Sequence, residues 1–143
     1  MPGAEGPAPQ GLTPDAGGLQ PASTDLRIDF GRAQEGAIAT VSRLLGAQPT
    51  DITTMADCGD VTAAYWADGL TMNFVDGDFR GWVLTEPDLT AAGGLTVGDM
   101  PPAVQMENTT LGQEFEVGGV WALVEETGPA ITTLWSGRTC FFR

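Results

Sequence analysis

The stretch GLTMNFVDGDFRGWVL (residues 69–84) decides how this sequence is expected to fold. Asp76 and Gly77 form a two-residue turn of the kind that type I′ hairpins prefer, because both positions need a positive φ angle. Apolar and polar residues alternate on either side, which predicts two antiparallel strands with one buried face. The predicted register pairs Val75 with Asp78, Phe74 with Phe79, Met72 with Gly81 and Leu70 with Val83. The core face then carries Leu70, Met72, Phe74, Phe79 and Val83.

One residue of this hairpin does not fit its predicted face. The same register places Trp82 with Thr71, Asn73 and Arg80 on the polar side. Two interpretations remain open: a loop or the second half of the molecule covers the indole, or Trp82 contacts a partner. If there is an interface, its candidate residues are Tyr65, Trp66, Arg80 and Trp82, although aromatic residues in strands more often belong to the core.

The segments before the hairpin predict a sheet with a helix on it. LRIDF (residues 26–30) alternates as a half-buried strand does, and residues 57–66 predict another strand. Between them, residues 33–45 predict a helix that ends at Gly46, with an apolar stripe that must pack on a sheet to be stable. The stripe consists of Ala37, Ile38, Val41, Leu44 and Leu45.

The pattern of the segments after the hairpin predicts the same outline in a weaker form. GGLTVGDMPPAVQ (residues 93–105) predicts a short second helix with Asp99 as its N-cap. Residues 114–126 and 130–142 predict two more strands. The fold class is therefore α+β: an antiparallel sheet with one or two helices packed on one face, with two tandem α-β-β units (residues 24–88 and 89–143) as a further option.

The N-terminal residues 1–23 are rich in proline, glycine and alanine and are expected to be a disordered tail or linker. They resemble no signal peptide. Such a tract often tethers a domain, so an export signal or lipid-anchored cysteine is expected upstream in the precursor. This places the domain in the periplasm or outside the cell.

The charge and the missing residue types exclude several functions. The chain has nineteen acidic residues, six arginines, no lysine and no histidine, which gives a net charge of −13. This charge repels nucleic acids and anionic membranes, and no apolar run is long enough for membrane insertion. Triads that use histidine, imidazole zinc sites and lysine Schiff bases cannot be built. We therefore expect no enzyme, no cofactor and no metal site, and a protein partner of unknown identity.

Carboxylates are the chemical groups that remain for catalysis, and they leave alternatives open. Paired acids among the glutamates could support a cell-envelope hydrolase, but no motif surrounds any of them. The aspartates near Cys58 and at the Asp76–Asp78 turn lack the spacing of a calcium loop. A proteinaceous enzyme inhibitor that inserts a loop into a cleft is the other alternative.

Cys58 and Cys140 are the two cysteines, and their spacing fits neither a metal site nor a CxxC redox motif. A disulfide between them is favoured, because both lie beside predicted strands and the composition suits an exported protein. The alternative is two buried free thiols.

Three short motifs carry a family resemblance: LLGAQP (residues 44–49), the hairpin GLTMNFVDGDFRGW (residues 69–82) and GLTVGD (residues 94–99). In these the chain resembles small exported bacterial α-β-β domains, among them the small lipoprotein subunit of the outer-membrane β-barrel assembly machinery and the β-lactamase inhibitor protein. The resemblance implies a non-catalytic envelope or secreted interaction domain, with no catalytic residues to carry over. The chain departs from the pattern in its short second helix and in having no lipobox.

Overall fold

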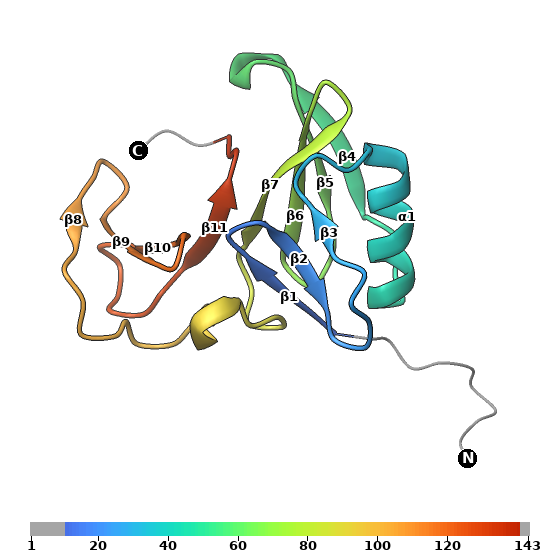
Figure 1. Cartoon of the computed structure of the whole chain (residues 1–143). Helices are drawn as coiled ribbons and strands as arrows, with labels where there is room; N and C mark the ends of the chain where they lie inside the picture. Colours follow the sequence, from blue (N-terminus) through green and yellow to red (C-terminus); the bar gives the residue numbers. More distant parts are fainter. Residues whose placement is uncertain (1–10, 141–143) are drawn as a thin grey trace.

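The structure is a computed structural model that describes residues 11–140. It has an α+β fold dominated by two antiparallel sheets (Figure 1). The small sheet has the order β1-β2-β3, and the large sheet has the order β4-β5-β6-β7-β11-β10-β9-β8. The elements in chain order are β1 (Leu12–Asp15), β2 (Gly18–Pro21), β3 (Ile28–Asp29), α1 (Gln34–Leu45), β4 (Asp51–Met55), β5 (Val61–Tyr65), β6 (Leu70–Val75), β7 (Asp78–Leu84), β8 (Glu107–Asn108), β9 (Gln113–Val117), β10 (Val120–Val124) and β11 (Thr133–Gly137).

The core lies between the large sheet and a layer made of α1 and the small sheet. Figure 1 shows β1–β3 in front of the central strands of the large sheet and α1 beside β4, whereas β8–β10 lie on the side away from the helix. Leu19 of β2, Val41 of α1 and Met72 of β6 are completely buried in one apolar cluster. Burial of this apolar surface is the main force that holds the layers together.

The helix forms as its sequence predicts. It spans Gln34–Leu45, and Gly46 ends it in the left-handed conformation at φ 71°. Ala37, Val41 and Leu44 are buried, and Ile38 and Leu45 pack beside them. The apolar stripe of the helix therefore faces the core, as expected for a short amphipathic helix.

The hairpin of β6 and β7 is confirmed at its turn but not along its whole length. Asp76 and Gly77 have φ angles of 52° and 81°, and Val75 pairs with Asp78 and Phe74 with Phe79. Beyond these pairs, Arg80 is an extra residue on β7, so Asn73 pairs with Gly81 and Met72 with Trp82. Such a β-bulge inverts the alternation beyond it.

The bulge corrects the predicted faces of Trp82 and Val83. Trp82 and Leu84 turn into the core and are completely buried. Val83 turns to the opposite face, where it packs with Leu123 and Trp135 in a second apolar cluster. Trp82 thus needs neither a covering loop on the polar face nor a partner, because the indole lies on the core face.

The expectation of a disordered N-terminal tail is wrong for residues 12–21. They form the β1–β2 hairpin, and Leu12 and Leu19 are buried. The buried surface of these two side chains acts together with the ladder of the hairpin, the ion pair of Arg27 with Asp15 and the hydrogen bond from the Trp82 indole to the Asp15 carbonyl, and the composition alone does not reveal these contacts. Residues 1–10 lie outside the described residues.

The second half of the chain also differs from the prediction. The described residues contain no α-helix after Leu45, and the segment from Asp99 to Met106 is irregular. Pro101 and Pro102 lack N–H donors, and the short segment has no apolar stripe to bury. The strand predicted at residues 114–126 is instead a hairpin of β9 and β10 that turns at Gly118 and Gly119. Of the strand predicted at residues 130–142, residues 133–137 form β11, and residues 141 and 142 lie outside the described residues.

Candidate interaction surfaces

The structure places the four predicted interface residues in different environments. Trp66 and Trp82 are 4% and 0% exposed, which corrects their proposed role as contact residues. Their indole N–H groups donate to the backbone carbonyls of Ala47 and Asp15, respectively. A buried Trp of this kind fixes loops to the core rather than offering a surface.

Tyr65 and Arg80 reach the surface but lie far apart along the sheet. Tyr65 is half-buried and pairs with Thr71 at the start of β6, and its hydroxyl lies 3.9 Å from the sulfur of Met55. Arg80 is exposed at the bulge near the other end of the hairpin, where its guanidinium lies 3.3 Å from Asp78. The structure therefore does not bring the four residues together into one site.

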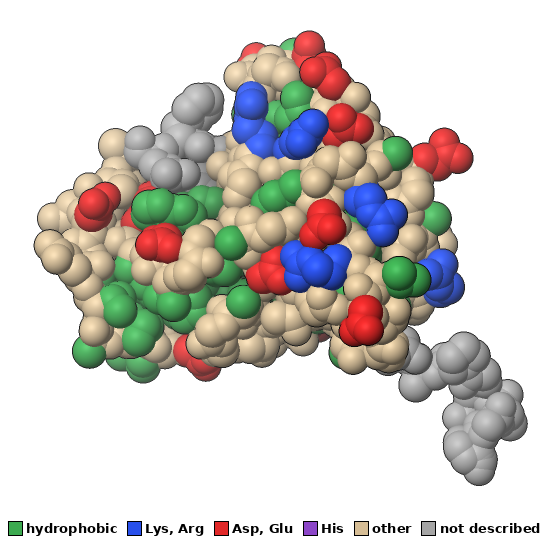
Figure 2. All heavy atoms as spheres, in the orientation of Figure 1, with side chains coloured by type: hydrophobic (Ala, Val, Ile, Leu, Met, Phe, Trp, Pro, Cys, Tyr) green, Lys and Arg blue, Asp and Glu red, His purple; other side chains and the backbone are tan. Residues whose placement is uncertain are grey.

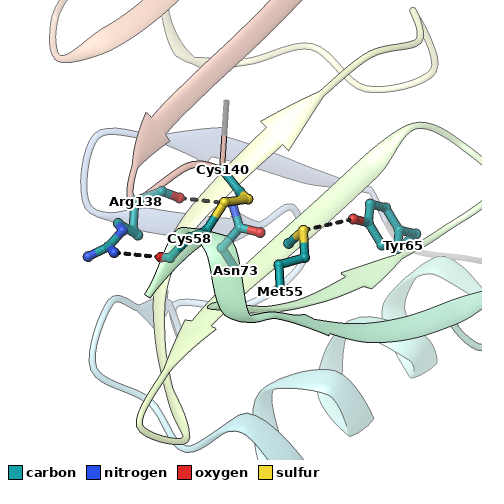
Figure 3. Close-up of a disulfide and its surroundings, with 6 residues drawn as sticks. All are labelled: Met55, Cys58, Tyr65, Asn73, Arg138 and Cys140. Carbon is teal, nitrogen blue, oxygen red and sulfur yellow. Dashed lines mark hydrogen bonds between the residues drawn. A yellow bond between two sulfur atoms is a disulfide. The ribbon is translucent and has the colours of Figure 1, made fainter. Parts of the chain in front are cut away.

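Cys58 and Cys140 form a disulfide, as the sequence favours, with their Cα atoms 5.6 Å apart (Figure 3). Cys58 ends a 3₁₀ turn (Ala56–Cys58) between β4 and β5, and Cys140 follows β11. Arg138 donates from its guanidinium to the Cys58 carbonyl, and the buried amide of Asn73 donates to the Arg138 carbonyl. The disulfide thus joins the segment after β11 to the connection between β4 and β5.

Two glycines allow the end of β11 to lie against the bulge of β7. Gly81 pairs with Gly137, and a Cβ atom on Gly81 would lie 2.1 Å from the Arg138 carbonyl oxygen. Gly137 has a φ angle of 76°. Any side chain at Gly81 would therefore push away the segment that carries Cys140.

Arg27 holds the small sheet together by charge. Its guanidinium binds both carboxylate oxygens of Asp15, at 2.7 and 2.9 Å, and its Nε lies 2.8 Å from Asp29. The hydrogen bond from Arg27 lowers the pKa of Asp15, against the opposing effect of burial, and the backbone N–H of Gly17 adds to the lowering. Both partners are less than one-third exposed, so solvent only partly screens this pair.

The lowered pKa makes the contribution of Asp15 dependent on pH. The folded-state pKa lies below the ordinary value of 3.8, so the stabilisation is complete above that value and is lost as the pH falls through the folded-state pKa. We expect Asp15→Asn to lower the free energy of unfolding by about 1 kcal/mol at pH 7. Urea denaturation of both proteins from pH 7 to pH 2.5 should show this difference shrinking below pH 4. A difference that stays constant would contradict the assignment.

The other acidic residues form no metal site in the part of the chain that the structure describes. Within residues 11–140, no three cysteine, aspartate or glutamate side chains lie close enough to hold a metal ion. Nor does any helix in this range have the length and apolar character needed to cross a bilayer.

An open groove lies at the end of the sheet that is far from α1. It has a volume of about 560 Å³ and is formed by the segment before β8, the β8–β9 hairpin and the β10–β11 loop. Its apolar side chains are Met100, Pro101, Met106, Val124 and Pro129. Glu125 and Glu126 lie at the same groove, so its apolar surface has an acidic margin.

Exposed apolar side chains gather beside this groove. Five large apolar side chains are exposed among the described residues, and three of them (Met100, Val104 and Leu111) belong to residues 100–111. Met100 is 65% exposed and also borders a second hollow with Val104, Val117 and Ile131. Figure 2 shows apolar side chains gathered at the lower left, where Figure 1 places β8 and the loop before it, with the arginines to their right. We call Met100, Val104 and the groove the apolar groove surface.

A different kind of surface lies at the opposite end of the large sheet. β4 is its terminal strand, and Asp51, Ile52, Thr53 and Thr54 are all exposed. A strand at this position leaves backbone N–H and C=O groups without partners in the sheet. The sequence analysis did not predict this strand.

No protein-family model matches the sequence, and searches of curated proteins and of solved structures find no similar protein.

Proposed function

We propose that this chain is a non-catalytic interaction domain that works in the periplasm or outside the cell and binds a protein partner through the apolar groove surface. The observation that carries the proposal is the exposure of Met100 and Val104 beside an open groove. Removing apolar side chains of this size from water is favourable, so a partner that covers them gains binding free energy. Clustered exposure of this kind is typical of binding surfaces.

The charges around the groove define the kind of partner. Glu125 and Glu126 border the groove, no arginine lines it, and the whole chain has a net charge of −13. A partner segment with apolar side chains and flanking lysines or arginines would complement both features. Acidic partners and nucleic acids would be repelled.

The disulfide supports the proposed compartment. A bond between Cys58 and Cys140 persists in oxidising surroundings such as the periplasm or the extracellular space. The resemblance to small exported α-β-β domains points to the same class of role. We also propose that the precursor carries an export signal and that the processed protein is either free or held by a lipid anchor.

Substitutions on the groove surface provide the test. The double variant Met100→Asp, Val104→Asp places two charges on the surface, and we expect it to lose at least about 2 kcal/mol of binding free energy for the natural partner. Wild-type and variant proteins would be cross-linked in the non-cytoplasmic fraction of the producing organism, and the products compared by quantitative mass spectrometry. The expected partner is cross-linked to the wild type and at least about 30-fold less to the variant.

Leu26→Asp is the matched control, because Leu26 is 74% exposed and lies outside the groove. It should leave capture of the partner unchanged. Equal capture by the double variant and the wild type would exclude the apolar groove surface. Hydrolysis of envelope material by the purified domain, without any captured partner, would favour an enzyme instead.

A further inference from the structure

The two edges of the large sheet are protected to different degrees. At one edge, β8 has only two residues and follows a segment with Pro101 and Pro102. At the other edge, β4 has five residues in regular register with β5, without a bulge, proline or lysine. Natural sheets usually protect their edges with such features, because an open edge pairs with other chains. The β4 edge therefore has the properties of a strand that is available for pairing.

The backbone groups that face the open side of β4 follow from its neighbour. The Tyr65 carbonyl accepts the N–H of Thr50 and so faces β4, whereas the N–H of Trp66 donates to Leu70 on the other side. Backbone direction alternates along a strand. The odd-numbered residues of β5 therefore face β4, and their partners Asp51, Thr53 and Met55 point back toward β5.

Ile52 and Thr54 consequently turn their N–H and C=O groups away from the sheet. Their side chains lie on the face that carries Met72 and Phe74, because Ile52 pairs with Ala64 and Thr54 with Thr62. Ile52 is 49% exposed although it lies on this face. The open edge thus offers two donors and two acceptors at the spacing of an antiparallel or parallel partner strand.

A hollow beside this edge provides room for the side chains of an added strand. Gln34, Glu35 and Ile38 of α1 and Ile52 of β4 line it, and its volume is about 420 Å³. Figure 1 shows α1 running alongside β4. A strand added to β4 would place alternate side chains in this hollow, between the helix and the sheet edge.

We propose that β4 binds an extended, basic peptide segment of another protein as an additional strand of the large sheet. Backbone hydrogen bonds to Ile52 and Thr54 provide the affinity, and the contacts with Ile38 and Ile52 select an aliphatic side chain. Glu35 lies beside the hollow, and Asp51 lies on the opposite face of β4. Basic residues on the peptide complement both acids.

The charge of the chain favours this occupant over a second copy of the domain. Edge-to-edge pairing of two copies would bring together two chains of net charge −13 and place Glu35 and Asp51 of both copies near one junction. Like charges at such a junction oppose association. A basic segment has the opposite effect.

A matched pair of variants separates edge pairing from other effects. Thr54→Pro removes one outward N–H, and its ring blocks the incoming strand, while no backbone hydrogen bond to β5 is lost. Thr54→Ala is the control, because both variants lose the contact of 2.8 Å between the hydroxyls of Thr54 and Thr62. The probe is a capped heptapeptide in which valine and lysine alternate, and binding is followed by NMR through the amide resonances of Ile52 and Thr53, which all three proteins retain.

We expect saturable shifts of these two resonances in the wild type. Thr54→Pro should weaken binding by about tenfold, whereas Thr54→Ala should change it by less than about twofold. N-methylation of alternate peptide amides should abolish binding without any change to the domain, which keeps the test valid if the proline variant does not fold. Replacing lysine with glutamate in the peptide should also abolish it.

Three results would overturn the proposal. They are the absence of saturable binding, equal affinity of the proline variant, and a wild-type dimer in sedimentation experiments that becomes monomeric with Thr54→Pro. The last result would assign the edge to a second copy. The Met100→Asp, Val104→Asp variant should bind the probe as the wild type does. A failure of the β4 proposal can therefore be distinguished from a failure of the proposal for the apolar groove surface.

Discussion

Removing the disulfide by replacing both Cys58 and Cys140 with alanine should lower the free energy of unfolding by about 4.5 kcal/mol, on the chain-entropy relation for a large loop. The two cysteines are separated by 82 positions, so the bond excludes many unfolded conformations. Guanidinium denaturation of the oxidised wild type and the double variant measures the difference. The denaturant dependence should also become steeper, because the unfolded variant is less compact.

Arg138→Ala is the control for local contacts at the disulfide. It removes the hydrogen bond to the Cys58 carbonyl but keeps the disulfide. Because Arg138 is exposed, this variant should lose less than about 1 kcal/mol. A double cysteine variant that loses no more than Arg138→Ala would show that the bond does not restrict the unfolded chain as proposed.

Replacing Trp82 with alanine should lower the free energy of unfolding by about 4 kcal/mol, since the side chain is completely buried. The change also removes the hydrogen bond of 2.7 Å from the indole to the Asp15 carbonyl, which joins the small sheet to β7. Hydrogen exchange should therefore accelerate most at the amides of β1 and β2. Urea denaturation and exchange mass spectrometry measure the two effects.

Trp82→Phe separates packing from the hydrogen bond. It keeps most of the apolar volume but loses the N–H donor, so we expect a loss of about 1–2 kcal/mol. If Trp82 lay on the polar face, as the unbulged register predicts, Trp82→Ala would cost less than about 1 kcal/mol. A small loss would therefore contradict the bulge at Arg80.

The elements with strong local signals could be predicted from the sequence. The helix at residues 33–45 follows from its apolar stripe and Gly46, and the turn at Asp76-Gly77 follows from the φ angles that it requires. The pairing of the two cysteines is favoured by their positions beside predicted strands and by the composition, and the structure confirms it. In each case the deciding residues are neighbours in the sequence or have a specific chemistry.

Two features that the predictions missed, the bulge in β7 and the hairpin of β9 and β10, do have signals in the sequence. Gly81 within a strand is typical of a bulge, and Gly118-Gly119 between apolar residues is a strong hairpin signal. The hairpin at residues 12–21 was harder to predict, because its proline-rich composition resembles that of a linker. Its order depends on packing of Leu12 and Leu19 against distant parts of the chain.

The candidate binding surfaces could not be predicted from the periodicity or motifs of the sequence. The apolar groove surface combines residues from 100 to 129 that share no periodicity. The β4 edge depends on the order of the strands, which the residues of β4 do not encode. Composition excluded many kinds of catalysis, but the position of the contacts follows from tertiary arrangement.

The place of β11 in the sheet has a consequence for biogenesis. This strand is the last of the described strands, yet it lies between β7 and β10. While residues 85–132 are being synthesised, β7 has an unsatisfied edge and the two halves of the sheet have no common strand. A nascent chain therefore stays incomplete and accessible to chaperones, and cooperative closure of the sheet requires β11.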